Sequence, residues 1–192
     1  MNYIIVDLEA TCWENDRSTP NEIIEIGAVK LNENPLVIDE FQSFVKPMLN
    51  PVLSDFCKKL TSIQQEEVDQ ASSFVEVVRE FQNWIGQDYW ICSWGLYDKK
   101  QFKHDCELYN LPTEWLRNHI SIKHQHGKLL AGRLQSEGKP RRDIKRVERG
   151  VGMETTLKMM NIPLEGTHHR GIDDARNITK IFVKLFPELK FE

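Results

Sequence analysis

The sequence predicts an α/β protein in which helices flank a mixed sheet. Strand-like segments come first, and the later strands alternate with helical patterns, as in sheets that are covered by helices. Residues 3–9 (YIIVDLE) are apolar on both alternating faces up to two acids, which indicates a strand buried on both sides. A length of 192 residues suits one domain with a sizeable core, so we expect a single domain over residues 1–192.

The elements after this strand follow from their patterns. Two strand-like runs on either side of the turn residues NENP predict an antiparallel hairpin over residues 22–47. Pro51 interrupts residues 48–68, which favours short helices there. Ser73 and Glu76 resemble a capping box, and the apolar residues behind them recur at helical spacing as far as Ile85.

The second half of the chain alternates between strand and helix patterns. It predicts first a buried strand over residues 88–94, a helix over 98–109, and a short strand or turn with a helix over 119–134. A mobile loop is expected over the basic residues 136–150. A short helix over 153–162 and a loop with a helix over 166–186 complete the chain.

Composition narrows the class of protein. The net charge of −4 gives no global positive field, so any contact with nucleic acid must be local. The four cysteines form no CxxC pair and have no Cys/His metal spacing, which is typical of free thiols in a reducing compartment. No signal-peptide pattern and no membrane-length apolar stretch is found, so we expect a cytoplasmic protein.

Two acids stand where the first strand ends. Asp7 and Glu9 are two residues apart, so both carboxylates point to the same face of the strand as Tyr3 and Ile5. Like charges at this spacing repel, and a buried unpaired carboxylate is costly. The strand therefore needs a neutralising group.

A third acid heads the apolar stripe of the last helix. Asp174 shares one helix face with Ile178 and Ile181, so it should point inward, either to a function or to a buried base. Its neighbour Asp173 falls with Asn177 on a polar face, where a first-turn acid is favoured by the helix dipole.

A fourth acid, Asp98, leads the apolar face that contains Phe102 and Cys106, although an aspartate at this position could also serve as an N-cap. Strand ends and helix starts gather at one edge of such sheets, where ligands bind. Four carboxylates converging there predict two divalent cations, Mg²⁺ or Mn²⁺, in the two-metal arrangement of phosphoryl hydrolysis. A histidine just before Asp174 could accept a proton from an attacking water.

Three motifs resemble those of the DEDD exonucleases, in the subgroup with a catalytic histidine. IIVDLEATC resembles the D-x-E motif, SWGLYDKKQF resembles the second motif, and HRGIDDARN resembles H-x4-D, which fits His169 with Asp174 and leaves His168 one residue out of register. DLEATCWE, LSDFCKKLTSI and WGLYDKKQF are similar to the branch of the three-prime histone mRNA exonuclease and the enhancer of RNA interference.

The resemblance implies a ribonuclease-H-like fold with a mixed five-stranded sheet. It also implies 3′–5′ removal of nucleotides from single-stranded 3′ ends, with RNA favoured over DNA, to give 5′-mononucleotides. Asp7 would bridge both cations, Glu9 and Asp174 would complete one site, Asp98 would hold the other, and His169 would be the general base. The residues implied to contact the terminal nucleotide are Leu8, Ala10, Thr11, Leu60, Thr61 and Ile63.

The chain departs from that branch in two ways. It starts at the first strand, without the nucleic-acid-binding module that precedes the nuclease in the histone mRNA enzyme, and its basic stretch over residues 139–149 is longer. This stretch is either a solvated loop or a phosphate-binding arm.

Two other functions of the chain stay open: a nucleic-acid-binding module without turnover, and a phosphodiesterase acting on short oligonucleotide remnants. No protein partner is indicated.

Overall fold

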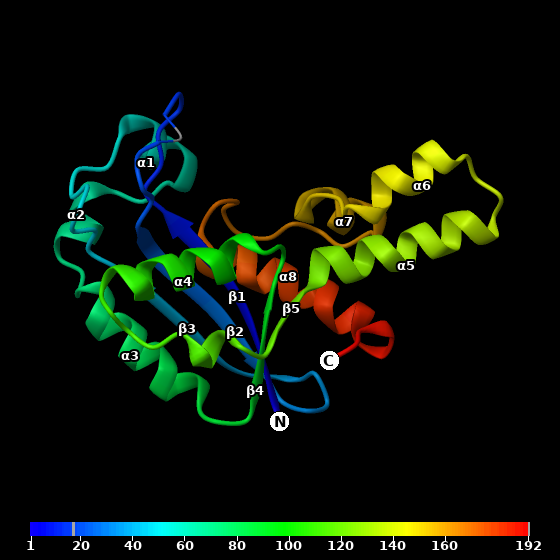
Figure 1. The fold of residues 1–192 in the computed structure, drawn as a ribbon, viewed down its shortest axis with the longest axis horizontal. Helices are drawn as coiled ribbons and strands as arrows, with labels where there is room; N and C mark the ends of the chain where they lie inside the picture. The colour runs from blue at the N-terminus through cyan, green and yellow to red at the C-terminus, as the bar shows by residue number, and fades with distance from the viewer. Residues whose placement is uncertain (17, 192) are drawn as a thin grey trace.

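The computed structural model describes residues 1–16 and 18–191, and its centre is a five-stranded mixed sheet with helices on both faces (Figure 1). The strands lie in the order β3-β2-β1-β4-β5. β1 pairs antiparallel with β2 and parallel with β4, β2 pairs antiparallel with β3, and β4 pairs parallel with β5. The strands are β1 (Asn2–Ala10), β2 (Ile23–Leu31), β3 (Val37–Phe44), β4 (Tyr89–Ser93) and β5 (His119–Ser121). The predicted mixed sheet and hairpin are confirmed.

Eight α-helices are found in the described residues. They are α1 (Asp55–Thr61), α2 (Gln65–Asp69), α3 (Phe74–Ile85), α4 (Tyr97–Leu108), α5 (Ile122–Ser136), α6 (Arg141–Glu148), α7 (Met153–Met159) and α8 (Gly171–Leu185). The predicted capping box at the start of α3 is present, with the Ser73 and Glu76 side chains each bonded to the other residue's backbone N–H. No helix in these residues combines the length and apolarity that crossing a membrane requires.

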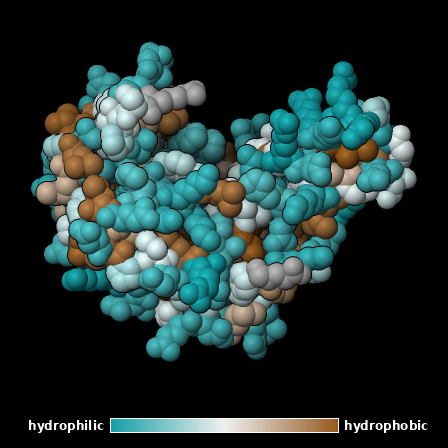
Figure 2. All heavy atoms as spheres, in the orientation of Figure 1, coloured by the Kyte–Doolittle hydropathy of each residue, from teal (hydrophilic) through white to brown (hydrophobic). Residues whose placement is uncertain are grey.

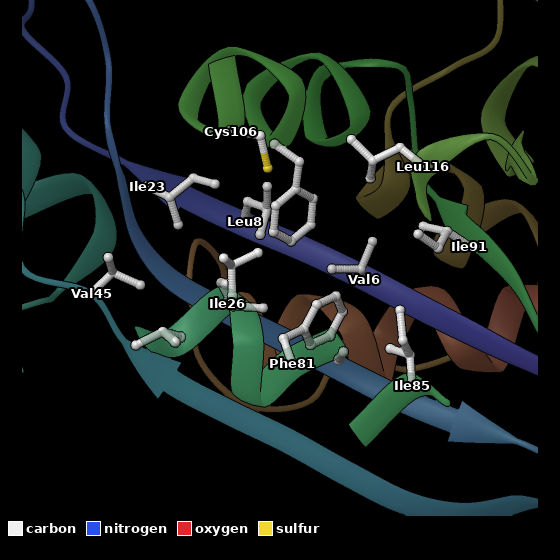
Figure 3. Packing of buried hydrophobic residues seen from close by; sticks show 14 of the residues in the cluster. Val6, Leu8, Ile23, Ile26, Val45, Phe81, Ile85, Ile91, Cys106 and Leu116 are labelled. Carbon is white, nitrogen blue, oxygen red and sulfur yellow. The ribbon is translucent and has the colours of Figure 1, made fainter. Parts of the chain in front are cut away.

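The sheet separates two apolar cores, which explains why β1 is apolar on both faces. Val6 and Leu8 pack with Phe81 of α3 and with α4 on one side (Figure 3). Tyr3 and Ile5 pack with α7 and α8 on the other side. Asp7 and Glu9 continue the Tyr3–Ile5 face, so the strand directs both carboxylates toward α8.

The prediction of a mobile loop over residues 136–150 is wrong. Arg141–Glu148 form the helix α6, which packs antiparallel on α5 as a hairpin projecting from the sheet (Figure 1). Ile144 and Val147 are its partly buried apolar residues, and they are one turn apart. The density of charge around these two residues hid the helical pattern in the sequence.

One smaller prediction is also wrong. Asn177 was expected on the polar face of the last helix, but it is fully buried and donates to the backbone carbonyls of Glu165 and Asp173. The alternative reading of Asp98 as the N-cap of α4 is excluded, since Leu96 occupies that position and Asp98 lies in the first helical turn.

Candidate active site

The carboxyl end of β1 and the first turns of α4 and α8 meet at one place. Asp7 and Glu9 come from β1, Asp98 from α4, and Asp174 from α8, and all four line one cavity of about 380 Å³. Glu9, Asp98 and Asp174 are each less than 10% exposed. The structure therefore brings together the four acids that the sequence singled out.

Backbone contacts fix the position of Asp98. One of its carboxylate oxygens accepts the Leu8 N–H at 3.2 Å, which ties the start of α4 to β1 between the two strand acids. Burial raises the pKa of Asp98 to about 6, although the backbone N–H groups that it accepts from act in the opposite direction.

The Asp174 carboxylate is held in position by two histidines of the loop that precedes α8. Its carboxylate accepts the backbone N–H of His169 at 3.0 Å, and the Nδ1 atom of His168 lies 2.9 and 3.0 Å from its two oxygens. The side chain is 5% exposed. The prediction that Asp174 points inward is confirmed.

Asp173 is not the freely solvated acid that was expected. Its carboxylate accepts the Thr167 backbone N–H at 2.8 Å and pairs with Arg176 at 3.2 Å. It therefore stabilises the loop that carries the two histidines, from outside the cavity.

The acids strongly perturb one another. Burial raises the pKa of Glu9 to about 8, and the nearby Asp174 and Glu25 carboxylates contribute to this rise. Burial, followed by Asp98, Glu9 and Asp174, raises the pKa of Asp7 well above its usual range. Such a cluster is stabilised by positive charge, which a cation can supply.

The donor set fits a hard divalent cation. Asp7, Glu9 and Asp174 each offer one oxygen within 4.8 Å of the others, and a second group of His168, His169 and Asp174 meets the same limit. The group of Asp7, Glu9 and Asp174 offers only oxygen ligands, which suit Mg²⁺ or Mn²⁺. These acidic groups could therefore bind metal.

Both histidine rings lie at the cavity, which the sequence did not predict. The His168 and His169 rings stack with centroids 4.0 Å apart, although only His169 fits the H-x4-D spacing. His169 has a φ of 64°, and this left-handed backbone turns the chain at that position. His168 is engaged with Asp174 through its ring, whereas within residues 1–16 and 18–191 the His169 ring makes no hydrogen bond.

The environment of His169 also affects its protonation. Burial and the neighbouring His168 lower the pKa of the His169 ring, while Asp174 acts in the opposite direction. A lowered pKa keeps more of the ring neutral near pH 7, in the form that can accept a proton.

Sequence reasoning missed the residues of β2 that hold the start of α8 against the sheet. Glu25 on β2 lies opposite Glu9 and is fully buried, and its carboxylate accepts the Gly171 N–H at 2.9 Å and pairs with Arg170 at 3.2 Å. A Cβ on Gly27 would lie 2.1 Å from the Gly171 backbone, so only glycine allows this approach. The signal was a glycine and an acid inside a mostly apolar strand, which indicates a close backbone approach and a buried partner.

Only one of the residues expected to contact the terminal nucleotide lines the cavity. Leu8 lines the cavity, but Ala10, Thr11, Leu60, Thr61 and Ile63 do not. The Thr61 hydroxyl donates to the Cys57 carbonyl, and Ile63 is fully buried in a small core with Cys57. Leu60 is 36% exposed. This stretch lies beside the end of β1, since Cys57 Sγ is 3.7 Å from the Ala10 carbonyl oxygen.

A larger cavity of about 680 Å³ lies near β5, between residues such as His119, Lys128 and Glu188. None of the four converging acids lines it. The chemistry of the side chains, rather than the size of the cavity, therefore identifies the candidate active site.

This sheet order, with carboxylates gathered at the end of its central strand, is typical of α/β hydrolases that act on phosphodiester bonds with the help of divalent cations. The sequence profile of the Exonuclease family (RNase_T) matches residues 4–182, and the chain therefore belongs to this family.

Curated relatives and solved structures agree with this membership. The chain is 32% identical to the 3′-5′ exonuclease eri1 of Schizosaccharomyces pombe, over 98% of this chain and 69% of that protein. It is 31% identical to the 3′-5′ exoribonuclease 1 of Homo sapiens, over 96% of this chain and 52% of that protein. It thus spans about half the length of the human relative.

The fold is similar to the crystallographic structure of the nuclease domain of 3′hExo, a DEDDh family member, bound to rAMP. The TM-score is 0.83 with 29% identity, over 100% of this chain and 96% of that one. A structure titled as 3′-end specific recognition of histone mRNA stem-loop by 3′-exonuclease matches with a TM-score of 0.81 and 28% identity, over 97% of this chain and 64% of that one. The predicted ribonuclease-H-like fold and exonuclease class are confirmed.

Proposed function

We propose that this chain is a 3′–5′ exoribonuclease that uses two divalent cations, Mg²⁺ or Mn²⁺, to release 5′-mononucleotides from RNA 3′ ends. Residues 1–192 would form one exonuclease domain, in line with the family match over residues 4–182. Relatives named as 3′-5′ exoribonucleases, and the similar nuclease domain bound to rAMP, support RNA as the substrate.

One observation carries the proposal: four acids from β1, α4 and α8 and a histidine pair from the loop before α8 line the same cavity. Asp7, Glu9 and Asp174 would hold one cation. Asp7 and Asp98 would hold the second. Bound there, the cations would stabilise the charge that develops on the phosphate and lower the pKa of the attacking water. A binding module without turnover would have no need for all four acids.

A histidine side chain would accept the proton of the attacking water. The His169 ring makes no hydrogen bond within the described residues and has a lowered pKa, so it can accept the proton that the attacking water loses as the P–O3′ bond breaks. The released nucleotide keeps the phosphate at its 5′ position. His168 would hold the Asp174 carboxylate in place through its Nδ1 contact.

Leu8, with Ala10 and Thr11, would approach the terminal nucleotide partly through backbone groups. Leu60 offers an exposed apolar side chain for contact with the base or sugar. Thr61 and Ile63 would act by fixing the position of Leu60, because both are buried in the protein.

The test uses one 20-nucleotide sequence as RNA and as DNA, labelled at the 5′ or the 3′ end, with Mn²⁺. We expect the 5′ label to report products that shorten one nucleotide at a time, and the 3′ label to appear at once as a mononucleotide, faster for RNA. Asp7→Asn is the control for contaminating nucleases. Internal cleavage fragments, or equal activity of Asp7→Asn, would contradict the proposal, and rapid hydrolysis of dinucleotides alone would favour a remnant phosphodiesterase.

A further inference from the structure

The hairpin of α5 and α6, residues 122–149, is here called the arm, and it carries charge of opposite sign to the rest of the chain. It contains nine Lys and Arg and three Asp and Glu, a net charge of +6. The chain as a whole contains 25 basic and 29 acidic residues, so the other 164 residues carry 16 and 26, a net charge of −10. A polyanion leaving the cavity would meet concentrated positive charge on the arm.

Four exposed basic residues, three in α6 and one at its C-cap, lie on one helix face. Arg142, Lys145, Arg146 and Arg149 are spaced i, i+3, i+4 and i+7, and all four are exposed. Ile144 and Val147 are partly buried, and α6 packs on α5. We call these four basic residues the basic stripe, which extends for about 10 Å along the helix. Figure 2 shows the arm as a largely hydrophilic projection with a hollow between it and the rest of the molecule.

The basic stripe has almost no acidic partners within the protein. Arg142 lies 3.6 Å from Asp143, in a pair whose arginine is 93% exposed. Within residues 1–16 and 18–191, Lys145, Arg146 and Arg149 form no ion pair. An exposed pair of this kind contributes little, so these charges are available to an external anion.

The base of the arm is part of the candidate active site. Lys123 in the first turn of α5 lines the cavity, and its backbone N–H donates to the carbonyl of Trp94, which also lines it. A Cβ on Gly150, just after α6, would lie 2.7 Å from the Lys123 carbonyl oxygen. A Cβ on Gly127 would lie 2.7 Å from the Val147 and Glu148 carbonyl oxygens. The two helices are thus in close contact at the base, and α5 extends from it for about 22 Å.

We propose that the basic stripe binds the phosphate backbone of the RNA strand several nucleotides upstream of the 3′ end that occupies the cavity. This proposal rests on the proposed function and deepens it, since it makes long RNA the preferred substrate over short remnants. The arm contacts phosphates and not base edges, so its contribution is independent of sequence and sensitive to salt.

The test compares two variants with the same change in charge. The arm variant replaces the basic stripe, Arg142, Lys145, Arg146 and Arg149, with Gln. The control variant replaces exposed basic residues of α3, α4 and the segment before β5 with Gln, namely Arg79, Lys100, Lys103 and Arg117. Both are made in an Asp7→Asn background, so that bound RNA stays intact.

Fluorescence anisotropy gives the Kd of a 20-nucleotide and a 3-nucleotide RNA between 50 and 300 mM KCl. For the arm variant we expect the Kd of the long RNA to rise by about tenfold or more. Its salt slope should become less steep by up to ~3, at about 0.7 for each phosphate that the protein no longer neutralises. The weakening should be confined to the long RNA, and the control variant should keep the slope within about 0.5. Equal melting temperatures of the two variants would verify that both are folded.

An unchanged salt slope in the arm variant, or an equal weakening in the control variant, would overturn the proposal. An acidic protein surface would then be the better candidate for the partner of the basic stripe. Binding in this experiment needs no turnover, so its outcome is separate from that of the hydrolysis test. A chain that binds through the arm but releases no nucleotides would contradict the proposed function alone.

Discussion

The acid cluster at the end of β1 and the basic stripe of α6 are each a group of like charges. The acid cluster is buried, whereas the basic stripe is exposed to solvent. Glu9, Asp98 and Asp174 are buried, and the pKa of Glu9 is raised to about 8. The basic stripe is exposed to solvent, and it belongs to a helix without a buried residue. Buried like charges raise one another's energy and require a counter-ion in place, whereas solvated charges cost little until a partner arrives.

The difference predicts different consequences of mutation. In the cavity, one carboxylate changes the electrostatics of all its neighbours, so a single substitution should have a large effect. On the arm, each charge acts through solvent and the effects should be small and nearly additive. The predictions below begin with the largest expected effect.

Asp7→Ala should reduce hydrolysis by at least about 10³-fold, because it removes the carboxylate expected to contact both cations, and a loss of several kcal/mol has this size. Single-turnover cleavage of a short RNA in saturating Mn²⁺ measures it. RNA binding should persist, since one crowded negative charge is gone. Near-normal turnover would rule out the two-cation site.

Asp174→Asn and Asp173→Asn test whether position, and not charge alone, distinguishes the two adjacent acids. Asp174 faces the cavity, and we expect a loss of about 10³-fold in kcat. Asp173 holds the Thr167 N–H and Arg176 outside the cavity, and we expect less than about tenfold. Equal losses would refute the assignment of the two helix faces.

His169→Ala should lose about 10²–10⁴ in rate, the usual range for a general base. His168→Ala should lose less, about tenfold, because it removes a side chain that orients Asp174 and leaves the free His169 ring in place. Single-turnover rates for both variants make the comparison. If His168→Ala had the larger effect, the base would be His168, and the match to the H-x4-D spacing would be misleading.

The acids of the site could be predicted from the sequence, but the residues that hold them in place could not. Asp7 with Glu9 followed from the two-residue repeat of a strand, and Asp174 from a helical stripe, because both periods depend only on local geometry. Glu25 and Gly27 were missed, since their roles depend on a contact with Gly171, which lies more than 140 residues away along the chain. The stacking of His168 on His169 depends on a left-handed φ in a loop, which no periodicity reveals.

The error at α6 has a different cause. Helix prediction relied on apolar stripes, and α6 has only Ile144 and Val147 to pack on α5, where Gly127 lets the two backbones approach closely. The four members of the basic stripe do lie at helical spacing. That periodicity of charge was the signal that could have revealed the helix.

The most direct test of the account is the effect of Mn²⁺ on thermal stability as a function of pH. The pKa of Glu9 is 4.5 when unperturbed and about 8 in the fold, so the unfolded chain loses this proton first. The metal-free protein therefore loses stability from this group as pH rises from about 4.5 to 8, with the full penalty above pH 8. Mn²⁺ binds the deprotonated carboxylates, so it should relieve this penalty most at high pH.

The quantity to measure is the difference in Tm with Mn²⁺ and with EDTA, from pH 5.5 to 8.5, because buried groups elsewhere, such as His119, affect both samples equally. We predict that Mn²⁺ at about 100 times its Kd raises Tm by about 5–10 °C at pH 8.5, and by clearly less at pH 5.5. In Asp7→Asn the gain should be small at every pH. A gain independent of pH, or equal in Asp7→Asn, would show that the four carboxylates are not the site at which a cation is bound.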